Sequence, residues 1–143
     1  MAHEEVEKLD HQGMGAWERQ DADAFVSLFA ENFTWRDWTL PEPMQDKEAA
    51  RNYFNAWMKA FPDFRVKSIS RVIGDDSVAA EIEFNGTHRG PLVMGDKEIP
   101  PTNKYIVGHG VYFARIQDGK IVSYSTHPDI AGLMMQLGLI PGM

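Results

Sequence analysis

The chain contains no cysteine, so neither disulfide bonds nor thiol chemistry is available to its 143 residues. Basic residues are scarce as well, because 14 Lys and Arg stand against 21 Asp and Glu, which gives a formal net charge of -7. This acidity argues against nucleic acid or an anionic membrane as the main partner. No apolar run approaches the roughly 20 residues that span a bilayer, and the charged start MAHEEVEKLDHQ is unlike a signal peptide. We therefore expect a cytoplasmic protein.

Several functional motifs are missing too. The sequence has no Gly-rich phosphate loop and no Gly-x-Ser-x-Gly nucleophile elbow. His88, His109 and His127 match no metal-ligand spacing and have no carboxylates arranged around them, so we expect no metal site. There is also no internal repeat, linker or low-complexity tract, which predicts a single domain over residues 1–143.

A hairpin pattern near the C-terminus is the strongest local signal that is present. Residues 103–116 are rich in β-branched and aromatic side chains, which are typical of strands. Asp118-Gly119 then lies between two apolar runs, which predicts a tight turn and a return strand over residues 121–126. Asp129 is a good N-cap for a short helix, and Gly138 lies where such a helix would end.

The rest of the chain predicts helices first and strands afterwards. Apolar residues at helical spacing, with Asp21 and Asp46 as caps, predict three helices, over residues 4–20, 22–30 and 47–60. Alternating or β-branched stretches predict strands over residues 31–40, 65–73 and 77–88, and a loop or short irregular hairpin over residues 90–101. Helices segregated to one side of an antiparallel sheet define the α+β class.

The strand over residues 103–116 has two largely apolar faces. One face carries Gly108 and Gly110 beside Tyr112, and these glycines indicate either a bend in a curved sheet or a hollow that faces a ligand. Because both faces are apolar, both are expected to be covered. Helices would cover one face, and a second subunit is a natural cover for the other.

Six short segments carry a resemblance to a known family through their order and spacing: residues 61–63 (FPD), 86–90 (GTHRG), 100–102 (PPT), 118–121 (DGKI), 128–129 (PD) and 136–138 (QLG). Together they resemble the SnoaL-like polyketide cyclases of the nuclear transport factor 2-like superfamily. The resemblance implies a cone-shaped α+β fold, with three N-terminal helices, a curved sheet around a deep apolar pocket and a short C-terminal helix. It also implies no metal or organic cofactor, and a homodimer or homotetramer that forms through the outer face of the sheet.

The resemblance also exposes a departure. In the characterised cyclases, an aspartate near the end of the last strand is the general acid/base, and a histidine on the preceding strand assists it. Aligned through the Asp-Gly-Lys-Ile turn, these positions are Thr126 and Tyr112 here. Threonine cannot exchange a proton near neutral pH as a carboxylate does, which argues against aldol cyclisation by that mechanism.

Asp37, Tyr112, His88 and His109 are the candidate catalytic residues. Asp37 lies between Trp35 and Trp38 and is either a general base in an apolar pocket or an exposed carboxylate paired with Arg36 or another arginine. Tyr112 can donate a hydrogen bond to a carbonyl or a developing oxyanion. His88 lies on the apolar side of its strand, as a hydrogen-bonded structural group or as a catalyst. His109 would point to the oligomer side unless a bulge shifts the register.

The resemblance also implies the residues of a substrate-binding wall: Trp17, Trp35, Tyr53, Trp57 and Thr126. Aromatic walls with few polar groups suit a hydrophobic small molecule. For Trp57 the alternative, an ordinary core residue, is favoured.

Two functions remain open from the sequence. The first is a cofactor-independent acid/base enzyme (a cyclase, isomerase, dehydratase or hydrolase) that acts on a hydrophobic small molecule. The second is a protein with the same pocket that binds a small molecule without changing it, and the missing Asp/His pair favours this second function. Fold alone does not choose between them.

Overall fold

The computed structural model describes residues 2–94 and 96–140 of the predicted single domain. Residues 1, 95 and 141–143 lie outside the described part. The described helices are α1 (Ala2–Glu18), α2 (Ala22–Val26), α3 (Lys47–Ala60) and α4 (Ile130–Gln136). The strands are β1 (Phe29–Asp37), β2 (Arg65–Ile73), β3 (Ser77–Thr87), β4 (Leu92–Met94), β5 (Lys97–Ile99), β6 (Tyr105–Gln117) and β7 (Lys120–Pro128). None of the described helices is both long and apolar enough to cross a membrane.

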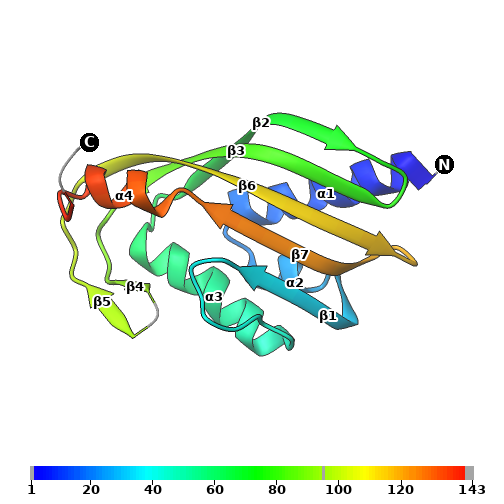
Figure 1. Cartoon of the computed structure of the whole chain (residues 1–143), viewed down its shortest axis with the longest axis horizontal. Helices are drawn as coiled ribbons and strands as arrows, with labels where there is room; N and C mark the ends of the chain where they lie inside the picture. Colours follow the sequence, from blue (N-terminus) through cyan, green and yellow to red (C-terminus); the bar gives the residue numbers. More distant parts are fainter. Residues whose placement is uncertain (1, 95, 141–143) are drawn as a thin grey trace.

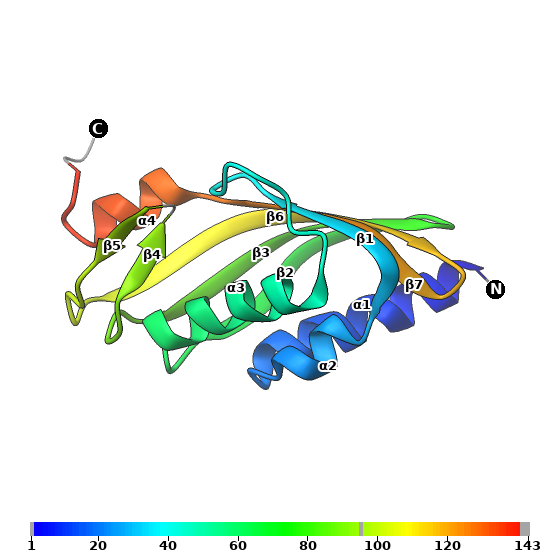
Figure 2. The same ribbon diagram turned by 90° about the horizontal axis from the view of Figure 1, so that it is seen from below.

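A curved sheet with helices on one side forms the body of the protein (Figures 1 and 2). Its strand order is β1-β7-β6-β3-β2, in which β1 runs parallel to β7 and the other neighbours are antiparallel. Helices α1, α2 and α3 cover the same side of the sheet, whereas α4 and the small β4-β5 sheet lie at one end. The predicted α+β class and curved, helix-covered sheet are confirmed.

Local signals placed most element boundaries correctly. The helix predicted over residues 47–60 and the strand over residues 65–73 have the predicted bounds. The side chains of Asp21, Asp46 and Asp129 each accept a hydrogen bond from the backbone N–H three residues later, as N-caps do. The segment predicted as an irregular hairpin contains β4 and β5.

The second helix is shorter than predicted, because it ends at Val26 and not at residue 30. The backbone carbonyl of Leu28 already accepts a hydrogen bond from the N–H of Ile121 at 2.9 Å, and Phe29 is paired with Ile121 in the sheet. Pairing with β7 therefore overrides the helical pattern, which is the usual result when tertiary contacts compete with local propensity.

The long hairpin of β6 and β7 turns at Asp118 and Gly119, whose φ angles are +53° and +76°. Two successive residues with positive φ are the signature of the tight turn that Asp-Gly predicts. Gly138, just after α4, also has a positive φ of +79°, which suits the glycine that ends a helix.

Different packing constraints explain why positions 108 and 110 are glycine. A Cβ atom at Gly108 would lie 2.3 Å from the ring of Phe84, its partner on β3, so the ring lies flat over the space that a side chain would need. At Gly110 a Cβ would lie 3.2 Å from the Cα of Pro128, and Gly110 also lines the cavity described below. Close approach within the sheet explains the first glycine, and the second borders a hollow.

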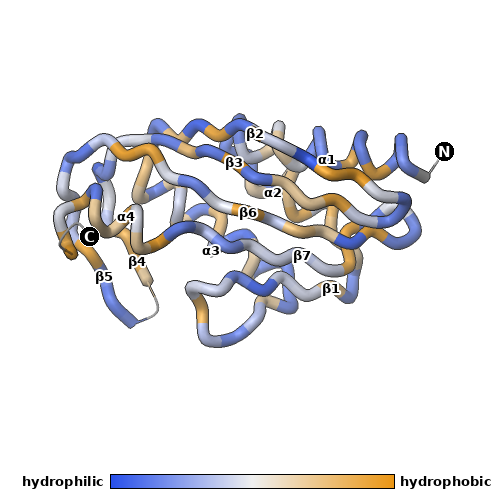
Figure 3. Tube along the Cα trace, turned by 45° about the horizontal axis from the view of Figure 1, so that its top comes forward, coloured by the Kyte–Doolittle hydropathy of each residue, from blue (hydrophilic) through white to orange (hydrophobic). Residues whose placement is uncertain are grey.

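Hydropathy alternates along the central strands (Figure 3), and alternate residues of β3 and β6 are buried beneath the helices. An aromatic cluster fills the space between the concave face of the sheet and the helices. Phe25 lies at its centre, with ring centroids 5.6 Å from Trp35, 5.5 Å from Tyr124 and 5.3 Å from Trp17. Edge-to-face pairs of this kind add about 0.5–1.5 kcal/mol each beyond the area that they bury.

The outer face of the sheet is open in the single chain. Tyr105 and Val111 on β6 are 60% and 46% exposed, and Ile69 and Val72 on β2 are exposed as well. The expectation that a second subunit covers this face stays a prediction, which sedimentation velocity of the purified protein would test.

The glycines allow a paired stability test. Gly108→Ala should lower the free energy of unfolding by about 1–3 kcal/mol, because the new methyl group overlaps the Phe84 ring. Gly13→Ala should raise it by about 0.5–1 kcal/mol, because a Cβ there meets Phe25 and Leu28 at an ordinary 3.7–3.8 Å within α1. Urea unfolding of both variants measures the two effects, and equal changes would contradict this packing account.

Candidate functional site

A cavity lies between the concave face of the sheet and helices α1 and α3. It leaves about 70 Å³ of room for the centre of a water-sized sphere, and its empty space amounts to about 580 Å³ when the solvent-filled mouth is counted. Its walls are mainly aromatic and aliphatic. All five residues predicted as a substrate-binding wall line it, together with Asp37 and Tyr112: Trp17, Trp35, Tyr53, Trp57 and Thr126.

Asp37 enters the cavity from the last position of β1. Its side chain is buried, with 2% of the residue exposed. Asp37 is paired in register with Thr126 on β7, which is paired with Tyr112 on β6, so the three side chains form a row across the concave face. Arg36 points elsewhere, with its guanidinium 5.1 Å from the centre of the Trp38 ring. The structure thus places Asp37 in the pocket and not in an arginine pair.

Hydrogen bonds hold the Asp37 carboxylate from two sides. The Thr126 hydroxyl donates to Oδ2 at 2.5 Å, and Thr39 donates to Oδ1 from its backbone N–H at 2.9 Å and from its hydroxyl at 2.5 Å. Thr126 in turn accepts from the indole Nε1 of Trp35 at 2.9 Å. Each carboxylate oxygen therefore has at least one donor from the protein itself.

Tyr53 completes this network from α3. Its hydroxyl lies 3.3 Å from the Thr39 hydroxyl, which already donates its proton to Asp37, so Tyr53 is the donor of this long hydrogen bond. Burial raises the pKa of Tyr53 far above its usual value, and the negative charge of Asp37 raises it further. The phenol therefore keeps its proton at physiological pH.

Tyr112 has a different partner from the one that its predicted role requires. Its hydroxyl donates to Oδ1 of Asp10 on α1, and Oδ2 of Asp10 accepts from Nη1 of Arg71 at 2.7 Å. Burial raises the pKa of Tyr112, and the Asp10 charge adds to the rise, so the phenol stays protonated. Because a phenol has one proton to donate, Tyr112 in this geometry cannot also donate to a substrate oxygen.

His88 lies away from the cavity, at the end where the β4-β5 sheet packs. It is fully buried, and its Nδ1 accepts a hydrogen bond from the backbone N–H of Thr102 at 3.2 Å. Its ring lies 5.6 Å from that of Phe61, and its Nε2 has no hydrogen-bond partner within the described residues. This placement matches the structural alternative.

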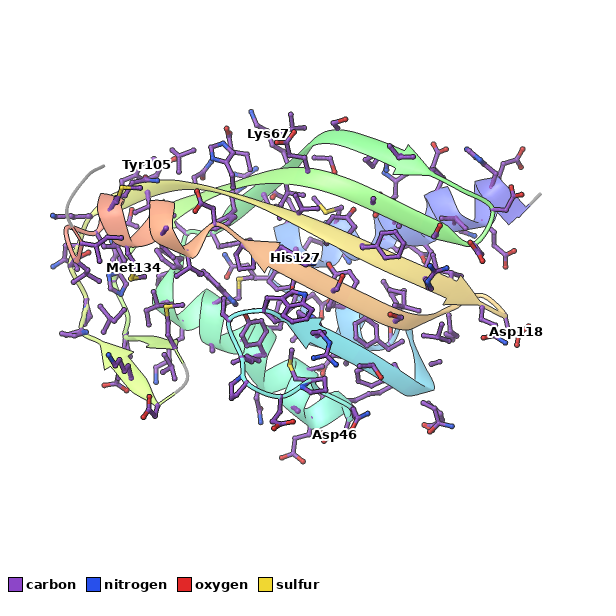
Figure 4. All side chains as sticks on the ribbon, viewed as in Figure 1. Asp46, Lys67, Tyr105, Asp118, His127 and Met134 are labelled. Atoms are coloured by element: carbon purple, nitrogen blue, oxygen red, sulfur yellow. The ribbon has the colours of Figure 1, made fainter. Side chains whose placement is uncertain are left out.

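His109 and His127 lie on or near the outer face. His109 is about half exposed, with Nε2 3.4 Å from the Glu83 carboxylate, and it does not line the cavity. His127, labelled in Figure 4, lies near the end of β7 at the rim of the cavity, with its ring centroid 5.9 Å from that of Trp38. Among the residues that the structure describes, no three His, Asp or Glu side chains form a group that could hold a metal ion.

Asp10, Thr39 and Tyr124 belong to the site but were not predicted. Asp10 follows Val6 by four residues and precedes Gly13 by three, so a carboxylate on the apolar face of the helix was a readable signal. Thr39 follows Asp37 by two residues, the spacing of an Asx-turn. Tyr124 shares the strand face of Thr126, and alternation along β7 could have identified it.

The chain belongs to the SnoaL-like polyketide cyclase family, whose family model matches residues 10–137. A 61-residue stretch is 39% identical to nogalonic acid methyl ester cyclase from Streptomyces nogalater. This stretch is 43% of the chain and spans 42% of the length of that relative.

Solved structures share the fold. AclR from Streptomyces galilaeus, described as a candidate hydroxylase, matches 99% of this chain and 85% of its own at a TM-score of 0.84 and 23% identity. SalBIII, an epoxide hydrolase/cyclase-like enzyme in pyran ring formation in the polyether salinomycin, matches 92% of this chain and 97% of its own at a TM-score of 0.73 and 20% identity. These matches confirm the SnoaL-like architecture.

Asp37 lies next to the position at which the family resemblance predicts an aspartate. Thr126 occupies the position implied for the family's aspartate, yet the Asp37 carboxylate lies 2.5 Å from the Thr126 hydroxyl. Because β1 and β7 are neighbours in register at these residues, the Asp37 carboxylate lies beside Thr126 at this part of the cavity.

The burial of His88 predicts a pH effect on stability. Burial lowers the pKa of His88 below its ordinary 6.5, which the nearby Gly90 backbone only partly offsets. The unfolded chain therefore takes up this proton first as the pH falls, so the free energy of unfolding should decrease below pH 6.5. This loss should level off once the pH passes the lowered pKa of the folded state.

Thermal unfolding of the wild type and His88→Gln from pH 8 to pH 5 checks this expectation. The stability advantage of the wild type over the variant should shrink as the pH falls through 6.5. His3→Gln, which replaces an exposed histidine of α1, is the control and should run parallel to the wild type. A constant difference between wild type and His88→Gln would contradict the prediction.

Proposed function

We propose that the protein is a cofactor-independent cyclase that closes a carbocyclic ring in an apolar, carbonyl-bearing small molecule. The supporting observation is the buried Asp37 carboxylate, held by Thr39 and Thr126 in an otherwise aromatic cavity. A methyl ester of a polyketide acid is the first substrate class to test, because the family model is that of polyketide cyclases and a partial relative is a nogalonic acid methyl ester cyclase.

In the proposed reaction, Asp37 removes a proton from the carbon next to a substrate carbonyl, which leaves an enolate. The enolate carbon attacks a second carbonyl of the same molecule, so one C–C bond forms and the attacked C=O becomes an alkoxide. The alkoxide takes the proton back from Asp37, and no atom or electron is left over. Positioned acid/base groups of this kind typically contribute 10²–10⁴-fold in rate.

Tyr53 is the proposed donor to the negative oxygen of the enolate. Its hydroxyl keeps its proton, lines the same cavity and makes only a 3.3 Å bond to Thr39, which a substrate oxygen can replace. Tyr112 is less suited to polarise that oxygen, because its hydroxyl already donates a hydrogen bond to Asp10. Donors aimed at developing charge in a buried site commonly supply the largest part of such catalysis.

A non-catalytic binding protein is the second candidate. Both Asp37 oxygens are satisfied by donors of the protein itself, so the carboxylate is stable in the cavity without reacting with anything. This function predicts that an apolar ligand binds and is recovered unchanged, whereas the cyclase predicts conversion.

Substitution of Asp37 tests the proposed base. In a ring-closure assay with nogalonic acid methyl ester, Asp37→Asn should lower kcat by at least about 100-fold, because the amide cannot take up the proton. Glu31→Gln removes an exposed carboxylate from the same strand and should leave kcat unchanged. A full rate in Asp37→Asn would refute the role of Asp37, and binding without turnover by the wild type would support the second candidate.

Parallel Tyr→Phe variants distinguish the roles of the Tyr53 and Tyr112 hydroxyls. Tyr53→Phe should reduce kcat by about 10- to 100-fold with little change in KM, because its hydrogen bond strengthens as the enolate forms. Tyr112→Phe should have the smaller effect on kcat, because its hydroxyl serves Asp10. The reverse order would show that Tyr112 exchanges its partner for the substrate.

A further inference from the structure

A second, smaller cavity lies behind the first and shares a wall with it. It is narrow, with about 20 Å³ of room for the centre of a water-sized sphere, and it is lined by apolar residues of α1, α2, β3, β6 and β7 with Asp10 as the one charged group. Three residues line both cavities: Met14, Tyr112 and Tyr124. The main cavity therefore ends at a single layer of side chains and not at the solid core.

Tyr112 is the best-anchored member of this wall. Its ring lies 5.7 Å from that of Tyr124, and only 3% of the residue is exposed. Its hydroxyl donates to Asp10, which is 7% exposed and is itself held by Arg71. A buried carboxylate that binds both a phenol and a guanidinium fixes the ring in one position, because moving it would leave a buried acceptor without its donor.

The residues behind Tyr112 are small or aliphatic. Gly13 faces the second cavity from α1, and Ala114, the next residue on the same face of β6, lies beyond Tyr112. Neither fills the space with a large side chain. Removal of the Tyr112 ring would join an apolar chamber to the main cavity, and the Asp10–Arg71 pair would remain intact at its edge.

We propose that Tyr112 is a partition that sets the length of substrate which the protein accepts, and that the chamber behind it is an unused extension of the binding site. The wild type would take a fused-ring carbonyl compound without a long tail, and the variant without the ring would also take one with an alkyl tail. This inference rests on the proposed function in one respect only, namely that the main cavity binds the substrate.

A series of anthraquinones with linear 2-alkyl chains tests the partition. Each methylene group that becomes buried strengthens binding by about fourfold. For Tyr112→Ala, the affinity ratio of 2-pentyl- to 2-methylanthraquinone, measured by fluorescence quenching of the cavity tryptophans, should exceed the wild-type ratio by at least about tenfold. Tyr112→Leu, a milder truncation, should shift the ratio in the same direction.

Two matched variants separate the ring from other effects. Tyr112→Phe keeps the ring without the hydroxyl and should retain the wild-type ratio. Ala114→Leu added to Tyr112→Ala refills the chamber from a position that does not line the main cavity, and it should cancel the gain. An unchanged ratio in both folded truncation variants, or an equal gain in Tyr112→Phe, would overturn the proposal.

Xenon-pressurised crystals of Tyr112→Ala give a readout that does not depend on the substrate class. Xenon should occupy one continuous space from the main cavity to the chamber near Asp10. Two separated sites, with neighbouring side chains collapsed into the gap, would overturn the partition. Failure of unsubstituted anthraquinone to bind the wild type would count against the proposed substrate class, and the xenon result would still decide the role of Tyr112.

Discussion

The burial of Asp37 is the constraint on which the site depends. An ionised carboxylate removed from water must recover its lost hydrogen bonds from the protein, and one orphaned buried acceptor costs about 1–3 kcal/mol or more. Thr39 supplies two donors from the loop after β1, and Thr126 supplies a third from β7. The parallel pairing of β1 with β7 therefore does more than extend the sheet, because it brings the acid and one of its donors into register.

A second buried carboxylate, Asp10, lies behind the Tyr112 wall of the cavity. Tyr124 lies between the two acids, and its pKa is raised first by burial and then by the charges of Asp10 and Asp37. The acids have different neighbours, because Arg71 compensates Asp10, whereas Asp37 has no salt bridge within the described residues. This asymmetry suits Asp10 to a structural role and Asp37 to chemistry.

Much of this arrangement could be read from the chain. The caps at Asp21, Asp46 and Asp129 and the Asp118-Gly119 turn were predictable, because a side chain and the backbone within a few residues decide each of them. Strand alternation puts Phe33, Trp35 and Asp37 on one face of β1, and all three are buried. The five wall residues came from the family resemblance, and the cavity brings them together. The end of α2 was misjudged, because its competitor, β7, is more than 90 residues away.

The sequence by itself determined the fold class and most of the element boundaries. These features follow from periodicity and local hydrogen bonding, which act over one or two turns of chain. Only the tertiary structure decided that Asp37 is bonded to Thr126, that Tyr112 gives its proton to Asp10 and that His88 lies outside the cavity. Each of these outcomes depends on contacts between strands or helices that are distant in sequence. The role of a polar side chain follows from the partner that the fold places within hydrogen-bonding distance of it.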